Sequence, residues 1–185
     1  MKENIPYLES WFYDLQKSIK ELKGIAIDKN IKLLFSISTT TCKHGTNKPY
    51  TTPVRFLENS LISGVVVFSK IQSIVVINIV KAFVDDFLID VEQKHNMKAA
   101  INSDTLKYFQ DKYFINGDIK CESILSIVRA IVADDRIIEY KANDITVDAI
   151  WTFLSTKLNY LSGKKVAIIG CGNIAETYFR AQDYF

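Results

Sequence analysis

Residues 166–175 read Val-Ala-Ile-Ile-Gly-Cys-Gly-Asn-Ile-Ala, an apolar run that ends in two closely spaced glycines. The run predicts a buried strand, and the pattern G-x-G-x-x-A at its end predicts a tight turn into a helix. Gly170 permits the turn, Gly172 lets a phosphate approach the backbone, and Ala175 allows the helix to pack closely on the strand. The first N–H groups of such a helix attract phosphate groups.

This strand and turn predict the opening βα unit of a Rossmann domain that binds NAD or NADP. We expect the cofactor to contact the turn and the start of the helix, at Gly170, Cys171, Gly172, Asn173, Ile174 and Ala175. The residue that distinguishes NAD from NADP is expected about 20 residues after the turn. The sequence ends at Phe185, before that position, and one βα unit cannot bury its own faces. We therefore expect residues 164–185 to be the start of an incomplete domain, inactive by itself.

Two other interpretations of the turn remain open. An ordinary strand-to-helix connection can need glycine for its backbone angles alone. A transferase with a nucleoside cofactor of the S-adenosylmethionine type would carry a similar G-x-G loop. In that loop an acidic residue is expected just before the first glycine, and Ile169 stands there instead. The dinucleotide interpretation is favoured because a strand pattern precedes the glycines and a helix-like segment follows them.

Apolar runs upstream of the turn alternate with helical patterns. Runs rich in Val, Ile, Leu and Phe predict strands at residues 33–38, 64–68 and 87–91. The spacing of apolar residues predicts helices at residues 7–23, 104–113, 121–133 and 146–161. Gly24 is expected to end the first helix. Asp144 or Thr146 is expected to cap the start of the last one, and Ser162-Gly163 to end it.

Three further segments carry weaker patterns. Residues 53–63 are expected to form a short helix with Pro53 in its first turn. Residues 74–79 fit either a strand or the start of a helix, and residues 136–140 fit a short strand or an extended connector. Continuous apolar strands separated by helices indicate a mostly parallel, buried sheet. We therefore predict an α/β protein: a three-layer α/β/α domain over residues 1–145, a linker helix over 146–163, and the Rossmann segment over 164–185.

The composition restricts the classes of binding partner and the cellular compartment that we expect for this protein. The chain has 185 residues, is 48% hydrophobic and carries a net charge of +2, without a basic run of the kind found in nucleic-acid-binding proteins. Three cysteines without paired spacing argue against a disulfide framework or a zinc site. Charged residues interrupt the most apolar stretch, at residues 74–91, so it does not predict a membrane span. We expect a cytoplasmic protein with no nucleic-acid or membrane partner.

The order of elements before the glycine turn resembles a known junction. Residues 143–150, followed by a helix that ends in Leu-Ser-Gly-Lys-Lys, are similar to the linker helix of methylenetetrahydrofolate dehydrogenase/cyclohydrolases and shikimate dehydrogenases. Residues 84–89 are similar to a Val-Asp-Gly-Ile-Leu-Val strand of the folate enzymes. The resemblance implies an N-terminal catalytic domain of the amino-acid-dehydrogenase-like type followed by a nucleotide domain, with the active site in the cleft between the two. The Tyr-x-x-x-Lys motif of the folate enzymes is absent, because Val54 stands four residues after Tyr50.

Two residues are candidates for catalysis. Lys70 follows a predicted strand, where a lysine could polarise a carbonyl group or transfer a proton. Asp144 echoes a substrate-binding aspartate of shikimate dehydrogenases. Without a catalytic role, Lys70 would be an ordinary solvated surface lysine and Asp144 would be a helix cap. The polar loop at residues 43–52 is expected to face the substrate, and Asp90 and Glu92 are expected to share one face of a strand.

These patterns favour an NAD(P)-dependent oxidoreductase. It would transfer a hydride between the nicotinamide and a small polar substrate held in the interdomain cleft. The alternative from a different class is a non-catalytic α/β module that forms a homodimer or binds a ligand.

Overall fold

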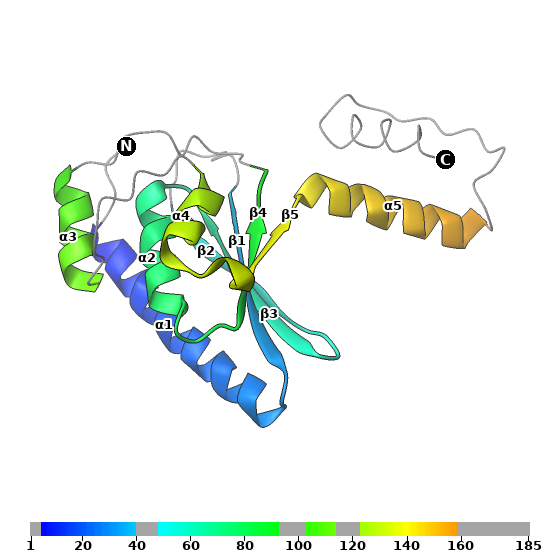
Figure 1. Cartoon of the computed structure of the whole chain (residues 1–185), viewed down its shortest axis with the longest axis horizontal. Coiled ribbons are helices and arrows are strands. Elements are labelled where there is room, and N and C mark those ends of the chain that lie inside the picture. The colour runs from blue at the N-terminus through cyan, green and yellow to red at the C-terminus, as the bar shows by residue number, and fades with distance from the viewer. Residues whose placement is uncertain (1–4, 40–47, 93–102, 114–122, 159–185) are drawn as a thin grey trace. The chain divides into compact units, whose positions relative to one another are not determined.

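A computed structural model describes residues 5–39, 48–92, 103–113 and 123–158. The chain divides into two compact units, Met1–Glu139 and Tyr140–Phe185, called unit 1 and unit 2 below. Each is described by itself. Unit 1 holds the helices α1 to α4 and nearly all of the sheet, and unit 2 holds the helix α5 (Figure 1).

The described residues form a five-stranded sheet in the order β2-β3-β1-β4-β5. Its strands are β1 (Lys32–Thr39), β2 (Tyr50–Phe56), β3 (Ser60–Val67), β4 (Asp86–Asp90) and β5 (Ile137–Tyr140). The central strand β1 is parallel to β3 on one side and to β4 on the other, and β2 is antiparallel to β3. The predicted α/β class with a mostly parallel sheet is therefore confirmed, and so are the strands predicted at 33–38, 64–68 and 87–91.

The hydrophobic core lies against one face of this sheet. Alternate residues of β1 are fully buried, and the residues between them are only partly covered. The helices are α1 (Ile5–Asp28), α2 (Lys70–Val80), α3 (Ser103–Tyr113) and α4 (Ile124–Ile131). In Figure 1 they gather on one side of the sheet, and α2 contacts the other three. The helix predicted at 104–113 is confirmed as α3, and the helix predicted at 121–133 is confirmed over Ile124–Ile131 as α4.

The α2 helix resolves the ambiguity at residues 74–79 in favour of a helix. Almost every residue of α2 is buried, and the helix contacts α1, α3 and α4. A helix that is apolar on all sides shows no amphipathic period, and its Ile and Val residues also fit a strand. Its helical state is therefore set by packing more than by local pattern.

The prediction that Gly24 ends the first helix is wrong. The helix α1 continues through Gly24 to Asp28, because Ala26 and residues before the glycine pack in the core. Asn30, with a φ of 52°, takes the left-handed conformation that ends the helix. The N–H of Ile31 donates to the carbonyl of Ala26 at 3.0 Å, and that of Asn30 to Ile27 at 3.0 Å, as in a Schellman motif.

The helix predicted at residues 53–63 is also wrong. Residues 50–56 form the edge strand β2, and β3 already begins at Ser60. Their aromatic and β-branched side chains suit a strand, and Pro53 is accommodated because a β-bulge lies between Thr52 and Arg55. Pairing with β3 therefore decides the state of this segment.

The described part of unit 2 is the 17-residue helix α5 (Ala142–Leu158). It confirms the predicted helix but begins earlier, so Asp144 and Thr146 lie inside its first turns and do not cap it. The Thr146 hydroxyl donates instead to the carbonyl of Ala142 at 2.9 Å. The predicted helix end at 162–163 and the strand and glycine turn at 165–175 lie outside the described residues.

Candidate functional site at the carboxyl edge of the sheet

The carboxyl ends of the three parallel strands meet at one edge of the sheet. Thr39 at the end of β1 pairs with Val67 at the end of β3, and Ile37 pairs with Ile89 near the end of β4. The chain leaves β1 toward β2 and β3, and it leaves β4 toward β5 on the opposite side. Ligands of open α/β sheets bind where neighbouring strands send the chain in opposite directions. The edge between β1 and β4 is therefore the candidate site.

A rigid turn carries Lys70 at this edge. The N–H of Phe68 donates to Oε1 of Gln72 at 2.9 Å, and the Gln72 side chain is fully buried. Ser69 caps α2 by accepting the N–H of Gln72 at 3.4 Å. The hydroxyl of Ser73 donates to the carbonyl of Ser69 at 3.2 Å. These contacts hold the connection between β3 and α2 in one conformation.

Lys70 is the first residue of α2, three positions after the end of β3, and it is partly exposed. No ion pair joins it to another described residue. Its ammonium group and the partial positive charge of the helix N-terminus have the same sign. Such a position suits an oxygen atom of a ligand, and the role predicted from the sequence, polarising a carbonyl group or transferring a proton, stays a prediction.

The end of β4 carries a buried carboxylate, that of Asp90, which was not predicted from the sequence as a catalytic residue. Asp90 is 4% exposed, and its Oδ1 accepts the N–H of Glu92 at 3.0 Å. The strand ends at Asp90, so the prediction that Asp90 and Glu92 share a strand face is wrong. The available signal was its place at the end of an apolar parallel strand, the edge at which open α/β sheets bind their ligands.

The other predicted site residues belong to unit 2 or lie largely outside the described residues. Asp144 lies in unit 2, exposed in the first turn of α5, with the Lys141 ammonium 4.0 Å from its Oδ2. The glycine turn, residues 170–175, lies outside the described residues. Most of the predicted substrate-facing loop lies outside them too, and only residues 48–52 are described.

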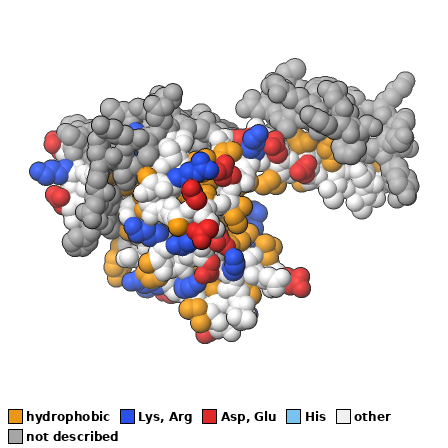
Figure 2. Space-filling model, in the orientation of Figure 1, with side chains coloured by type: hydrophobic (Ala, Val, Ile, Leu, Met, Phe, Trp, Pro, Cys, Tyr) orange, Lys and Arg blue, Asp and Glu red, His pale blue; other side chains and the backbone are white. Residues whose placement is uncertain are grey.

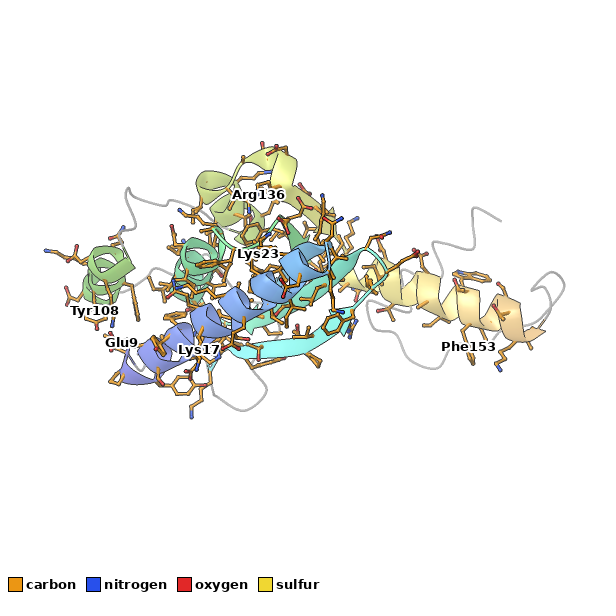
Figure 3. All side chains as sticks on the ribbon, turned by 90° about the horizontal axis from the view of Figure 1, so that it is seen from below. Glu9, Lys17, Lys23, Tyr108, Arg136 and Phe153 are labelled. Carbon is orange, nitrogen blue, oxygen red and sulfur yellow. The ribbon has the colours of Figure 1, made fainter. Side chains whose placement is uncertain are left out.

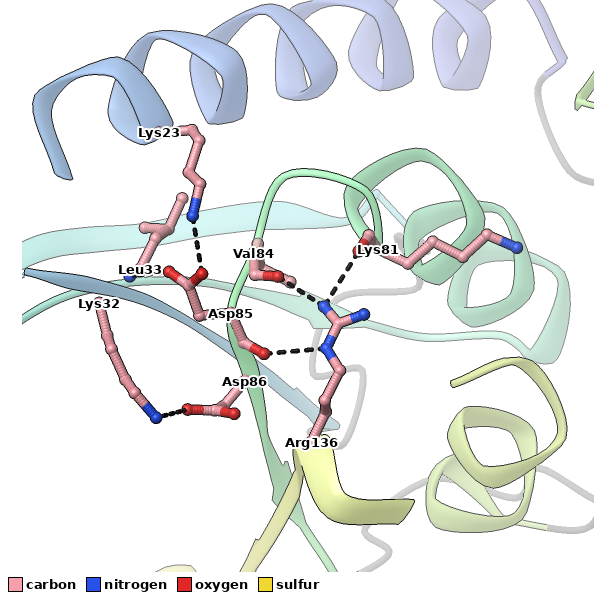
Figure 4. A network of polar contacts seen from close by, with 8 residues as sticks. All are labelled: Lys23, Lys32, Leu33, Lys81, Val84, Asp85, Asp86 and Arg136. Carbon is pink, nitrogen blue, oxygen red and sulfur yellow. Dashed lines mark hydrogen bonds and ion pairs between the residues drawn. The ribbon is translucent and has the colours of Figure 1, made fainter. Parts of the chain in front are cut away.

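A second polar cluster lies at the opposite, amino-terminal edge of β1 and β4 (Figure 4). The Asp85 carboxylate accepts hydrogen bonds from Lys23 Nζ and the N–H of Leu33, each at 2.7 Å. Lys32 and Asp86 form a more exposed ion pair at 2.9 Å. Each carboxylate here has a partner within the chain, and parallel sheets seldom bind ligands at this edge. The cluster is therefore structural: it ties α1 and β1 to the start of β4.

The contacts of Asp85 make the stability of the fold sensitive to acid. Partial burial acts to raise the pKa of Asp85, but the hydrogen bonds from Lys23 and Leu33 outweigh it and hold the pKa below its ordinary value. A carboxyl whose pKa is depressed by folding stabilises the fold above its unfolded pKa. That contribution disappears as the pH falls through the folded pKa.

Asp85→Asn is therefore expected to cost about 1 kcal/mol of unfolding free energy at pH 7, the value of one screened, charged hydrogen bond. The gap between the variant and the natural protein should narrow as the pH falls below the ordinary pKa of an aspartate and through the lowered pKa of folded Asp85, because Asp85 then becomes neutral in the natural protein as well. Urea unfolding over a series of pH values from neutral to acidic measures this. Asp86→Asn, at the more exposed pair, is the control with a smaller effect at pH 7. An Asp85→Asn gap that stayed constant with pH would contradict the assignment.

Surface charges of both signs are interspersed on the visible face of unit 1 (Figure 2). One group bridges helices: Glu9 of α1 accepts hydrogen bonds from Tyr108 and Lys112 of α3, and Glu9 and Tyr108 lie close together in Figure 3. The hydrogen bonds from Lys112 and Tyr108 lower the pKa of Glu9. This exposed contact joins two helices and has no feature of a binding site.

Comparisons with protein-family models, curated proteins and solved structures found no match to this chain. Within the described residues, no group of three or more His, Cys, Asp or Glu side chains is arranged to hold a metal ion. None of the described helices combines the length and the apolar character needed to cross a bilayer. The carboxyl edge of the sheet and the sequence after α5 are the two features of this chain that bear on its function.

Proposed function

We propose that this chain is the N-terminal part of an NAD(P)-dependent oxidoreductase. The observation that carries the proposal is the sequence G-x-G-x-x-A at residues 170–175, directly after an apolar run. The α/β unit upstream and the long helix α5 before the glycines support it, because the resemblance implies that order of elements. The enzyme would move a hydride between the nicotinamide and a small polar substrate.

In this proposal the carboxyl edge of unit 1 receives the substrate. Lys70 would interact with a carbonyl or carboxylate oxygen, and the rigid Ser69–Gln72 turn would keep the ammonium group in place. Asp144 is retained as a second candidate, from unit 2. Residues 170–175 would hold the cofactor pyrophosphate through backbone N–H groups. The finer fold would be a three-layer α/β/α domain followed by a Rossmann domain.

The test uses the full-length natural protein, with any residues that its gene encodes beyond Phe185. The proposal predicts saturable binding of NADH or NADPH, measured by fluorescence titration. Gly172→Val is expected to weaken binding at least about tenfold, because a side chain there would occupy the place of the pyrophosphate. The dinucleotide should also raise the melting temperature of the natural protein and not that of the variant.

Gly24→Ala is the matched glycine control. A Cβ atom at Gly24 would meet no other atom within 4 Å, so this variant should fold and bind the dinucleotide as the natural protein does. A full-length protein that bound neither NADH nor NADPH would overturn the proposal. Binding of S-adenosylmethionine in the same titration would indicate the transferase alternative.

A further inference from the structure

The chain passes from unit 1 to unit 2 between Glu139 and Tyr140, and an arginine with unusual contacts lies just before this boundary. Arg136 is the last residue of a short 3-10 turn, η1 (Asp134–Arg136), which leads directly into β5. The segment from Asp134 to Glu139 is therefore the last part of unit 1 before the boundary.

Arg136 attaches this segment to a turn that is distant in sequence. Its Nε donates to the carbonyl of Asp85 at 2.9 Å, and its Nη2 donates to the carbonyls of Lys81 at 3.0 Å and Val84 at 2.5 Å (Figure 4). The guanidinium also lies 5.8 Å from the ring centroid of Phe87. All three carbonyls belong to the connection between α2 and β4.

The carbonyl of Lys81 lies at the end of α2, where the last carbonyls have no partner within the helix, and those of Val84 and Asp85 lie in the turn that follows. Lys81 is the C-cap of α2, where the helix also presents its partial negative charge. One guanidinium satisfies three such acceptors at once through its planar set of donors, which an ammonium group cannot reproduce. The contact is therefore specific to arginine.

A second arginine contacts the same segment from a different position. Arg129 of α4 pairs with Glu139 at 2.6 Å and with Asp134 at 3.5 Å. Its side chain is 52% exposed, and solvent screens such surface pairs so strongly that they contribute little. The two arginines therefore offer a matched comparison, because both hold residues 134–139 but only one bonds to backbone carbonyls.

We propose that Arg136 is a fixed pivot at the boundary between the units. It holds residues 134–139 on the turn between α2 and β4, so residues 137–139, the part of β5 that belongs to unit 1, keep their place and any movement of the following chain begins after Glu139. The pivot does not depend on the proposed oxidoreductase function. In a two-domain enzyme it would set the point from which the second domain moves.

Hydrogen–deuterium exchange of the complete chain tests this proposal. In Arg136→Met the amides of residues 137–139 should exchange about tenfold faster or more, as expected when a charged donor to several acceptors is lost. The amides of β1 should keep their protection and so report that unit 1 is folded. Arg129→Met should change the exchange of residues 137–139 less than about threefold.

Two results would overturn the pivot. One is unchanged exchange at residues 137–139 in Arg136→Met, and the other is an equal acceleration in Arg129→Met. If the amides of β1 also exchange faster in Arg136→Met, unit 1 is no longer folded in that variant, and the test passes to Arg136→Lys. This variant keeps the positive charge and removes the planar set of donors. Faster exchange confined to residues 137–139 in Arg136→Lys supports the proposal, and exchange like that of the natural protein contradicts it.

Discussion

Gly64→Ala is expected to destabilise the protein by about 3 kcal/mol, and Gly64→Val by more, because the sheet has no room for a side chain there. Gly64 pairs with Ser36 of β1 on one side and with Thr52 of β2 on the other. An added Cβ atom would lie 2.7 Å from the carbonyl oxygen of Ser36 and 2.8 Å from its Cβ. Neither atom can move away by rotation of a side chain, so the strands themselves would have to separate.

Urea unfolding followed by circular dichroism measures this loss. Gly24→Ala is again the control, and it should be neutral or stabilising by up to about 1 kcal/mol, because it adds a good helix former to α1 in open space. Stability of Gly64→Ala within about 0.5 kcal/mol of the natural protein would contradict the close approach of β3 and β1.

Phe87→Ala is expected to cost about 3–5 kcal/mol, the usual loss for a fully buried phenylalanine. Phe87 lies in β4 with no exposed surface, and its ring meets that of Phe35 edge to face, with the centroids 6.2 Å apart. The substitution would leave a cavity between two neighbouring parallel strands. Arg136 would also lose the ring beneath its guanidinium.

The midpoint of thermal or urea unfolding measures this effect. Phe56→Ala is the matched control, because Phe56 is 58% exposed on the edge strand and its loss should cost less than about 0.5 kcal/mol. Equal losses in the two variants would show that β4 does not lie in the core.

The parts of the fold that the sequence predicted are those whose local pattern agrees with their surroundings. The sequences of β1 and β4 are apolar runs flanked by polar residues, and both strands lie between other strands in the sheet. Their composition alone was therefore enough to predict that they are buried strands. The prediction of a helix at residues 53–63 was wrong because the state of the edge strand β2 depends on its pairing with β3. The end of α1 was missed because Asn30 supplied the left-handed conformation usually supplied by glycine.

Some features of the candidate site could likewise be predicted from the sequence, and others could not. The position of Lys70 followed from the preceding strand, and the structure puts it at the start of α2, at the carboxyl edge. The burial of Asp90 and the contacts of Asp85 and Arg136 could not be predicted, because those contacts join residues 51 to 62 positions apart. Such pairs depend on the sheet order and on the placement of α2, which no local pattern specifies.

The bulge and Pro53 in β2 also affect how molecules of this protein behave toward one another. The strand β2 forms one border of the described sheet, and a regular border strand would be a template for the strands of other molecules. Pro53 removes a backbone donor from that border, and the bulge breaks the even spacing of the remaining donors and acceptors. The sheet therefore ends in a strand that resists extension into fibrils or edge-to-edge aggregates.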